Sequence, residues 1–241
     1  MTGARELLDV VVDSSGVATV TMSDPASHNA LSHAMVRCLW DTFARLGSDD
    51  GVRVILLAGL SDMFSSGASR EVLNDLISGK RDPGELVLPR ALLDCPLPCI
   101  SAMAGSAIGG GFALGVAADI VLLAQESRYC LNFMNLGFTP GMGTTRLLEH
   151  VLSPAVAHEL LLSGEARRGR DFAVNSGLNH ILPAADVLAK ATDLAQRIAE
   201  KPRSALVALK RVLSMPRRQL FEEARTQEAL MHTHGSPPSR G

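Results

Sequence analysis

With 241 residues, of which 46% are hydrophobic and 20% charged, the chain has the size and composition of one large globular domain. Its formal net charge is -2 and it contains no basic run, so we expect no nucleic-acid partner. No segment is long and apolar enough to cross a bilayer, and no apolar signal segment begins the chain, so we expect a soluble, cytoplasmic protein without membrane association. The cysteines have no metal-ligand spacing and are expected to be buried and reduced: Cys38, Cys95, Cys99 and Cys130.

Strands and helices alternate through the first half of the chain. Apolar residues alternate with polar ones on both sides of Ser14-Ser15-Gly16, which predicts a hairpin of strands at 8–12 and 17–22. Further strands are expected at 52–59, 99–104 and 119–124, and helices at 32–46, 70–77, 86–95 and 112–118. Because the two types of element alternate, we predict an α/β fold built from repeated ββα or βαβ units.

The second half is predicted to be nearly all helical from Gly143 onward. Helical spacing of apolar residues places these helices at 144–152, 154–163, 169–176, 184–200, 202–214 and 216–232. We therefore divide the chain into a core domain at 1–185, a C-terminal helical region at 186–234 and a disordered tail at 235–241, which is rich in glycine, serine and proline.

Two glycine-rich turns carry the first chemical signal. Gly109-Gly110-Gly111 lies between a predicted strand and a predicted helix, where the first N–H groups of the helix have no partner within it and suit an oxygen that carries negative charge. By itself this turn is equally typical of tight packing between a strand and a helix. The turn at Ser66, Gly67 and Ala68 also follows a buried strand and precedes a helix. Together the two turns could present two N–H donors to one oxygen, each typically worth about 3 kcal/mol when aimed at developing charge.

The order of these motifs resembles the crotonase (enoyl-CoA hydratase/isomerase) superfamily. The resemblance rests on Asn29-Ala30-Leu31, Phe64-Ser65-Ser66-Gly67-Ala68, Gly105 to Gly111, Ala118-Asp119 and Leu136 to Thr145. It implies an α/β fold, a crotonase-like spiral of ββα units with a helical C-terminal trimerisation region. It also implies thioester substrates carried on CoA or phosphopantetheine, no further cofactor or metal, and a homotrimer or a dimer of trimers. The backbone N–H groups of Ala68 and Gly110 would form the oxyanion hole, with Ser66, Gly67 and Gly109 beside the substrate.

The chain departs from the hydratases of this family at two positions. Hydratases carry two glutamates in the site, and the corresponding positions here are Ala113 and Phe133. Because adding water across a double bond requires a carboxylate to activate the water and an acid to protonate carbon, we expect no ordinary hydratase activity. Ala113 and Phe133 would instead line the substrate site, and Asn135 would either bind substrate or serve as a core or cap residue.

Two further segments resemble the crotonase-like decarboxylases of polyketide β-branching cassettes, which act on 3-methylglutaconyl groups tethered to acyl carrier protein. These segments are 66–73 and the C-terminal stretch 223–232. The resemblance implies a catalytic lysine, matched best by Lys80, and a catalytic histidine, matched best by His232 with His234 as the competing candidate. Without the resemblance, Lys80 would be read as a solvated surface charge and His232 as a helix-end or surface residue.

We therefore predict a crotonase-type decarboxylase that acts on a 3-methylglutaconyl thioester, with acyl carrier protein as partner. The neutral His28, where CoA-using relatives often carry a cation, favours a carrier protein over CoA. The alternatives are an enoyl-CoA isomerase or hydratase-like enzyme, a thioester hydrolase, and a crotonase homologue that binds thioesters without catalysis. The cluster of Arg167, Arg168 and Arg170 is either a solvated loop or a docking patch for an acidic carrier.

Overall fold

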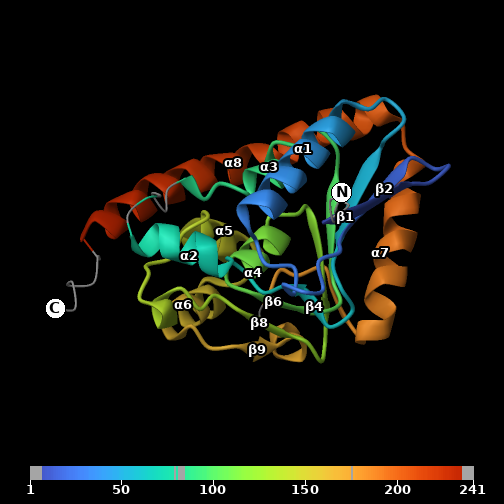
Figure 1. The fold of residues 1–241 in the computed structure, drawn as a ribbon. Helices are drawn as coiled ribbons and strands as arrows, with labels where there is room; N and C mark the ends of the chain where they lie inside the picture. The colour runs from blue at the N-terminus through green and yellow to red at the C-terminus, as the bar shows by residue number, and fades with distance from the viewer. Residues whose placement is uncertain (1–6, 79, 81–84, 175, 235–241) are drawn as a thin grey trace, which may run out of the picture.

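A computed structural model describes residues 7–78, 80, 85–174 and 176–234, without the side chains of residues 233 and 234. Its larger sheet contains, in spatial order, β1 (Leu8–Val12), β2 (Val17–Met22), β3 (Val54–Ala58), β5 (Cys99–Met103), β7 (Ile120–Ala124) and β10 (His180–Leu182). The smaller sheet contains, in spatial order, β4 (Met63–Ser65), β6 (Ser106–Ile108), β8 (Arg128–Cys130) and β9 (Arg167–Arg168). Neighbouring strands are parallel except in the β1–β2 hairpin and the β8–β9 pair. The predicted α/β fold is therefore confirmed (Figure 1).

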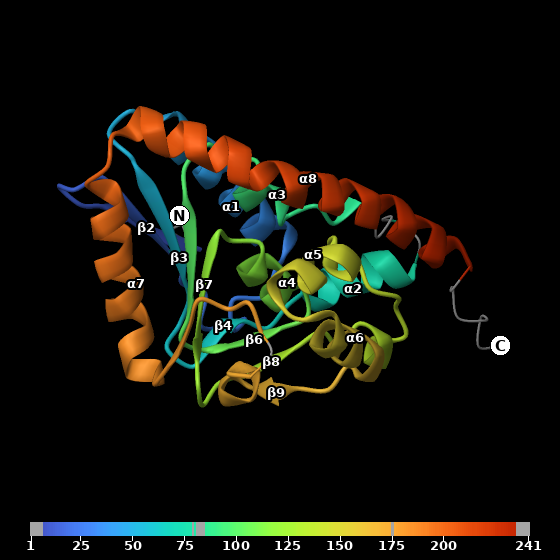
Figure 2. The ribbon, with the colours of Figure 1, turned by 180° about the vertical axis from the view of Figure 1, so that it is seen from behind.

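The helices enclose these sheets on several sides. They are α1 (His33–Ser48), α2 (Arg70–Ile77), α3 (Arg90–Leu93), α4 (Gly110–Val116), α5 (Thr144–Val151), α6 (Pro154–Ser163), α7 (Ala184–Ala199) and α8 (Arg203–His234), with short 3-10 helices η2 (Met134–Leu136) and η3 (Gly169–Phe172). Figures 1 and 2 show α7 standing along one face of the larger sheet, while α8 runs across one side of the whole molecule.

Alternation along the buried strands divides the core in two. Along β3, Val54 and Leu56 face α7, and Ile55 and Leu57 face the layer that contains α1 and α4. The small residues of α7, such as Ala191, allow that helix to pack closely on the sheet. Each large aliphatic side chain that becomes fully buried contributes about 1.5–3 kcal/mol. The predicted boundary between residues 185 and 186 falls inside α7, which shares this core with the strands.

Several predicted elements differ from the structure, and each difference has a local cause. The helix expected at 86–95 is reduced to α3, which begins after Pro89 and ends before Pro96. The helix expected at 169–176 is only η3, and the region predicted to be nearly all helical also contains the short strands β9 and β10. The short strands β4 and β8 were not predicted, since three residues carry too little periodicity to be recognised.

The break predicted near residue 215 is also wrong, because α8 continues through Pro216. A proline inside a helix costs about 3 kcal/mol, so contacts on both sides of it must hold the helix in place. We call these contacts the Asp119 cluster: the Asp119 carboxylate accepts hydrogen bonds from Lys210 Nζ at 2.6 and 2.7 Å and from Arg217 Nη1 at 3.3 Å. Arg217 Nη2 also donates to the carbonyls that directly follow α4, at 2.6 Å to Ala117 O and 3.0 Å to Ala118 O. The cluster therefore anchors the middle of α8 to the end of α4.

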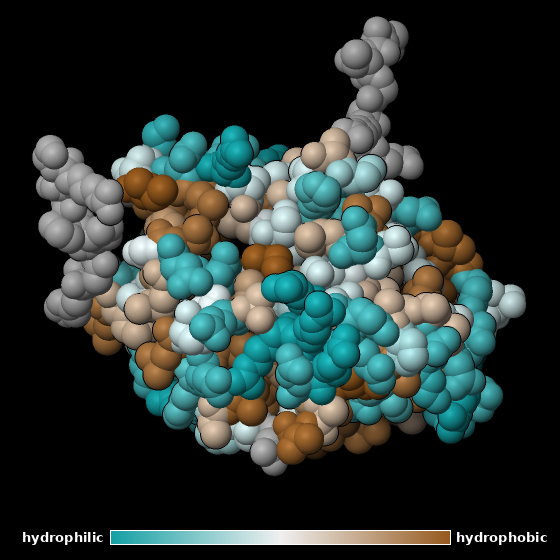
Figure 3. Space-filling model, turned by 90° about the horizontal axis from the view of Figure 1, so that it is seen from below, coloured by the Kyte–Doolittle hydropathy of each residue, from teal (hydrophilic) through white to brown (hydrophobic). Residues whose placement is uncertain are grey.

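The surface bears on the predicted partners. No helix in the described ranges is long and apolar enough to cross a membrane. Figure 3 shows hydrophilic side chains gathered in the centre of the face seen from below, the side of Figure 1 on which β9 lies. Of the three arginines predicted as a cluster, Arg168 and Arg170 are exposed, while Arg167 pairs with Glu159.

Cys95, Cys99 and Cys130 are buried free thiols as predicted, whereas Cys38 is only partly buried. The predicted tail at 235–241 lies outside the described residues.

Candidate active site

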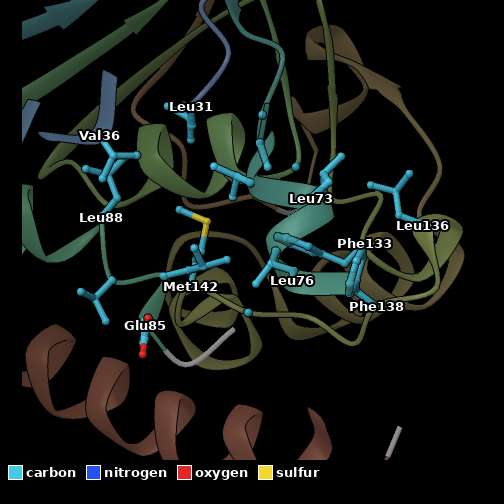
Figure 4. A pocket seen from close by; sticks show the side chains of 18 of the residues that line it. Leu31, Val36, Leu73, Leu76, Glu85, Leu88, Phe133, Leu136, Phe138 and Met142 are labelled. Atoms are coloured by element: carbon cyan, nitrogen blue, oxygen red, sulfur yellow. The ribbon is translucent and has the colours of Figure 1, made fainter. Parts of the chain in front are cut away.

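A cavity of about 640 Å³ opens between α1, α2, the two glycine-rich turns and the end of α8. Its walls are mostly apolar, and Figure 4 shows leucine, valine, phenylalanine and methionine side chains converging on it from elements far apart in the sequence. A cavity of this size is typical of sites that bind small molecules. It contains both of the turns that the sequence singled out.

The first turn is held by a buried asparagine. Asn29 is completely buried and has a positive φ of 54°; its side-chain amide donates to Met22 O and Phe64 O, each at 3.0 Å. The backbone of the same segment pairs with the turn, since Leu31 N donates to Gly67 O at 2.7 Å. Gly67 itself has a φ of +84°, a backbone conformation that residues other than glycine rarely adopt. The segment before α1 therefore fixes the position of Ala68.

The second turn packs directly against the first. Gly109 has a φ of +51° and its N–H donates to Cys130 O at 2.9 Å, and the helix α4 begins at the next residue. A Cβ added at Gly67 would lie 2.6 Å from Ile108 O and 3.5 Å from Gly110 N. The absence of a side chain at Gly67 therefore lets the backbone of one turn approach the backbone of the other.

Ala68 and Gly110 both line the cavity. Within the described ranges, neither of their backbone N–H groups donates a hydrogen bond to another part of the chain. Two backbone N–H groups that the fold leaves without a partner beside one cavity are suited to an oxygen atom of a ligand. The position of Gly110 at the N-terminus of α4 adds the positive end of a helix dipole.

Another part of the cavity wall comes from the segment 133–142 between β8 and α5, in which six residues line the cavity: Phe133, Leu136, Phe138, Thr139, Gly141 and Met142. Phe133, Leu136 and Phe138 line the cavity and are seen together in Figure 4. Met142 has a left-handed backbone, with a φ of 61°, and its sulfur would lie 3.0 Å from a Cβ added at Gly110. Positive φ at a residue other than glycine costs of order 1–3 kcal/mol and occurs preferentially at functional sites. The strained methionine therefore narrows the cavity directly beside the Gly110 N–H.

A histidine from α8 forms the polar edge of the cavity. His232 lines it, and its Nδ1 lies 2.6 Å from Thr139 Oγ1. One turn earlier on the same helix, the buried carboxylate of Glu228 accepts hydrogen bonds from Gly143 N at 2.9 Å and Thr145 N at 3.1 Å. The end of α8 is thus attached at two points to the segment that carries Met142.

The structure brings most of the predicted site residues together. Ala68, Gly110 and His232 line one cavity, and so do Ser66, Gly67, Gly109 and Phe133. Ala113, which was predicted to line the substrate site, is 1% exposed, packs in the core and is not among the residues that line the cavity.

Three other predicted positions lie elsewhere or are undescribed. The Asn135 side chain donates to Gly164 O at 3.0 Å and does not line the cavity as described, and its role in binding substrate stays a prediction. Lys80 is exposed and does not line the cavity as described, so the structure does not place it at the substrate. The side chain of His234 lies outside the described part of the chain.

The comparisons with known proteins agree with this geometry. The profile of the enoyl-CoA hydratase/isomerase family matches residues 13–237. The chain belongs to this family. The bacillaene synthase decarboxylase PksI of Bacillus subtilis is 37% identical over 228 residues, which cover 95% of this chain and 92% of the relative.

Two solved structures are similar over nearly the whole chain. The ECH2 decarboxylase domain of CurF from Lyngbya majuscula shares 36% identity, with a TM-score of 0.90 over 96% of this chain and 95% of that one. A structure described as a dehydratase/decarboxylase enzyme couple involved in polyketide beta-branching shares 36% identity, with a TM-score of 0.92 over 97% of this chain and 92% of that one. The resemblance inferred from the motifs, and the fold that it implied, are therefore confirmed.

Sequence reasoning missed the residues that support this crotonase-family site. Asn29 and Thr139 stand in the motifs that carried the resemblance, yet nothing in their spacing shows which atoms they bind. Glu228 could have been noticed from its position four residues before His232, a spacing that places both on one face of a helix. In the described ranges no three His, Cys, Asp or Glu side chains gather as a metal site would require.

Proposed function

We propose that this enzyme is a crotonase-type decarboxylase that converts a 3-methylglutaconyl thioester, carried on acyl carrier protein, into a methylcrotonyl-type thioester. The observation that carries the proposal is the combination of Ala68 and Gly110 N–H groups with a largely apolar cavity in which neither hydratase glutamate is present. The relatives named as decarboxylases support the same reaction.

The chemistry needs few groups. The bond between the substrate carboxylate and its neighbouring carbon breaks, CO₂ leaves, and the electron pair passes through the conjugated double bond to the thioester oxygen. The Ala68 and Gly110 N–H groups stabilise that oxyanion, each typically contributing about 3 kcal/mol. A proton from an acid then adds to carbon while the electron pair on the oxyanion re-forms the thioester C=O, and we assign the supply or direction of this proton to His232, which lines the cavity.

The substrate carboxylate also needs a partner before it leaves. We assign this role to Lys80, whose exposed side chain has to turn toward the cavity when substrate is bound. Arg37 on α1 is the rival cation, because it already lines the cavity. Replacing each by methionine decides between them: loss of the carboxylate partner raises KM or lowers kcat/KM for the glutaconyl substrate. If K80M matches the wild type while R37M does not, the role of Lys80 is refuted.

The partners follow from the same proposal. We assign the substrate to acyl carrier protein, with phosphopantetheine as the arm that carries it and no other cofactor, in a cytoplasmic pathway. We further propose a homotrimer or a dimer of trimers. Support comes from apolar side chains exposed on α8, where Leu209, Val212 and Leu213 are 57%, 61% and 60% exposed. Light scattering coupled to size exclusion measures the mass directly, and a monomer at micromolar concentration would contradict this assignment.

The deciding experiment incubates purified protein with 3-methylglutaconyl-carrier protein and follows the acyl group by mass spectrometry. The expected result is a mass loss equal to one CO₂. Water addition or loss without CO₂ would indicate a hydratase-like enzyme, and release of the free acid would indicate a thioester hydrolase. Migration of the double bond at constant mass would indicate an isomerase, while binding without any turnover would leave a non-catalytic homologue. Each of these outcomes would refute decarboxylation.

A further inference from the structure

The last third of α8 has one face in continuous contact with the segment 139–145. Phe221 lies so close to Gly143 that a Cβ added at the glycine would be 2.3 Å from the phenylalanine ring. Ala224 is completely buried, Glu228 is 2% exposed, and His232 reaches Thr139 at 2.6 Å. Positions three or four apart lie on the same side of a helix, so these residues form a single row.

Glu228 is the polar member of this row. One carboxylate oxygen accepts from Gly143 N at 2.9 Å, and the other accepts from Thr145 N at 3.1 Å and from Thr145 Oγ1 at 3.0 Å. These donors stand at the N-terminus of α5, whose first N–H groups have no partner within the helix. The N-cap residue is Gly143, which has no side chain to supply one. A carboxylate from a distant helix therefore caps α5.

This arrangement is not explained by stability alone. Burial raises the pKa of Glu228 above its ordinary value, although three hydrogen bonds act in the opposite direction. A raised pKa means that the ionised carboxylate costs more in the folded protein than in water. The charge by itself is therefore a cost, while the hydrogen bonds of the carboxylate impose a defined geometry on Gly143 and Thr145.

We propose that Glu228 is a positioning residue for the reaction: by clamping the end of α8 to the N-terminus of α5, it holds the His232 imidazole against Thr139 at the cavity edge. The inference rests on the proposed function, because it gives His232 its role in proton transfer. The same clamp fixes Gly143, which immediately follows the strained Met142 beside Gly110. One carboxylate thereby sets both the histidine and the methionine that face the substrate.

The test compares E228Q with the wild type and with E223A, a matched loss of a glutamate from an exposed position of the same helix. Glutamine has nearly the same shape, but its amide NH₂ faces an N–H donor where the carboxylate oxygen accepted a hydrogen bond. We expect E228Q to fold and to bind substrate with a KM close to that of the wild type. Its kcat should fall by about 10²-fold, the effect typical of a displacement of about 1 Å in a catalytic group. E223A should match the wild type.

A double-mutant cycle separates positioning from a general structural effect. If Glu228 acts through His232, adding E228Q to a His232→Ala variant should cause little further loss of kcat, whereas independent effects would multiply. Multiplying losses, or a kcat of E228Q within threefold of the wild type by our criterion, would overturn the inference.

An NMR measurement that does not depend on catalytic turnover tests this inference separately from the proposed function. In protein carrying ¹³C-labelled histidine, the His232 imidazole signal is assigned by its absence in the His232→Ala variant. We expect E228Q to shift or broaden that signal and to leave exposed His158 unchanged. If wild-type protein fails to release CO₂, the proposed function fails, and this signal still tests the clamp. An unchanged His232 signal would refute it.

Discussion

The close approach of the two glycine-rich turns is open to a direct test by the substitution Gly67→Ala. The added methyl carbon would lie 2.6 Å from Ile108 O, a backbone atom that cannot rotate away, and 3.5 Å from Gly110 N. The turns would have to separate, which moves the Ala68 N–H relative to the Gly110 N–H. Loss of one aligned donor costs about 3 kcal/mol in the transition state, which corresponds to a decrease in kcat of about 10²-fold.

Gly137→Ala is the matched control, because Gly137 has a φ of +79°, close to the +84° of Gly67, but nothing within 4 Å of an added Cβ. Both variants carry the left-handed strain of about 1–2 kcal/mol, which lowers Tm by roughly 2–8 °C in a chain of this length. Only Gly67→Ala should also lose activity, as measured by CO₂ release from the glutaconyl-carrier substrate under saturating conditions. Equal kcat values for the two variants would show that the approach of the two turns does not matter for catalysis.

Three further predictions concern the polar contacts around α8. Thr139→Val removes the 2.6 Å contact with His232 while keeping the shape of the side chain. It should lower kcat by about tenfold or more and alter the pH–rate profile. An unchanged pH–rate profile would contradict a role of this contact in catalysis. Asp119→Ala leaves two buried cations without their carboxylate and should lower the free energy of unfolding in urea by about 3–5 kcal/mol. Asp94→Ala removes ion pairs that are only partly buried and should lower the free energy of unfolding by about 1 kcal/mol or less. Equal losses in the Asp119→Ala and Asp94→Ala variants would refute the importance of burial for these ion pairs. The pKa of Glu228 is raised in the folded state, so its contribution to stability is greatest below its unfolded pKa and is lost as the pH rises through the folded value. The free energy of unfolding of the wild type relative to E228Q should therefore fall with rising pH across that window, and a rise would show the opposite sign of shift.

The fold could be predicted largely because its strongest signals are local and periodic. The helix predicted at 70–77 has the same bounds as α2, and the apolar run near residue 55 is the buried strand β3. The predictions that were wrong concern features that depend on contacts between segments far apart in the sequence. Pro216 indicated a helix end, yet the Asp119 cluster holds the helix on both sides of it. The short strands of the smaller sheet depend on pairing with each other and leave no periodicity in the sequence.

The site was predicted unevenly for a related reason. Backbone donors such as those of Ala68 and Gly110 follow from glycine-rich turns that can be read in the sequence, and the cavity contains both. Side-chain placement does not follow from motif spacing. Ala113 follows the Gly-Gly-Gly turn closely but points into the core, while Glu228 is far from it in sequence and supports the cavity edge. Lys80 is exposed, and its role stays a prediction.

The two halves of the proposed reaction are carried by different parts of the fold. The proposed donors for the oxyanion belong to closely packed backbone turns, since a methyl group at Gly67 or Gly111 would meet backbone atoms at 2.6 and 2.7 Å. The proposed proton donor belongs to α8, which the Asp119 cluster and Glu228 attach to the rest of the fold at successive points. Substitutions on the last third of α8 should therefore alter the proposed proton delivery while the two turns keep their packing, whereas substitutions at Met142 change the cavity wall itself. A separation of this kind is a physical way in which a scaffold without the two hydratase glutamates can support a different reaction.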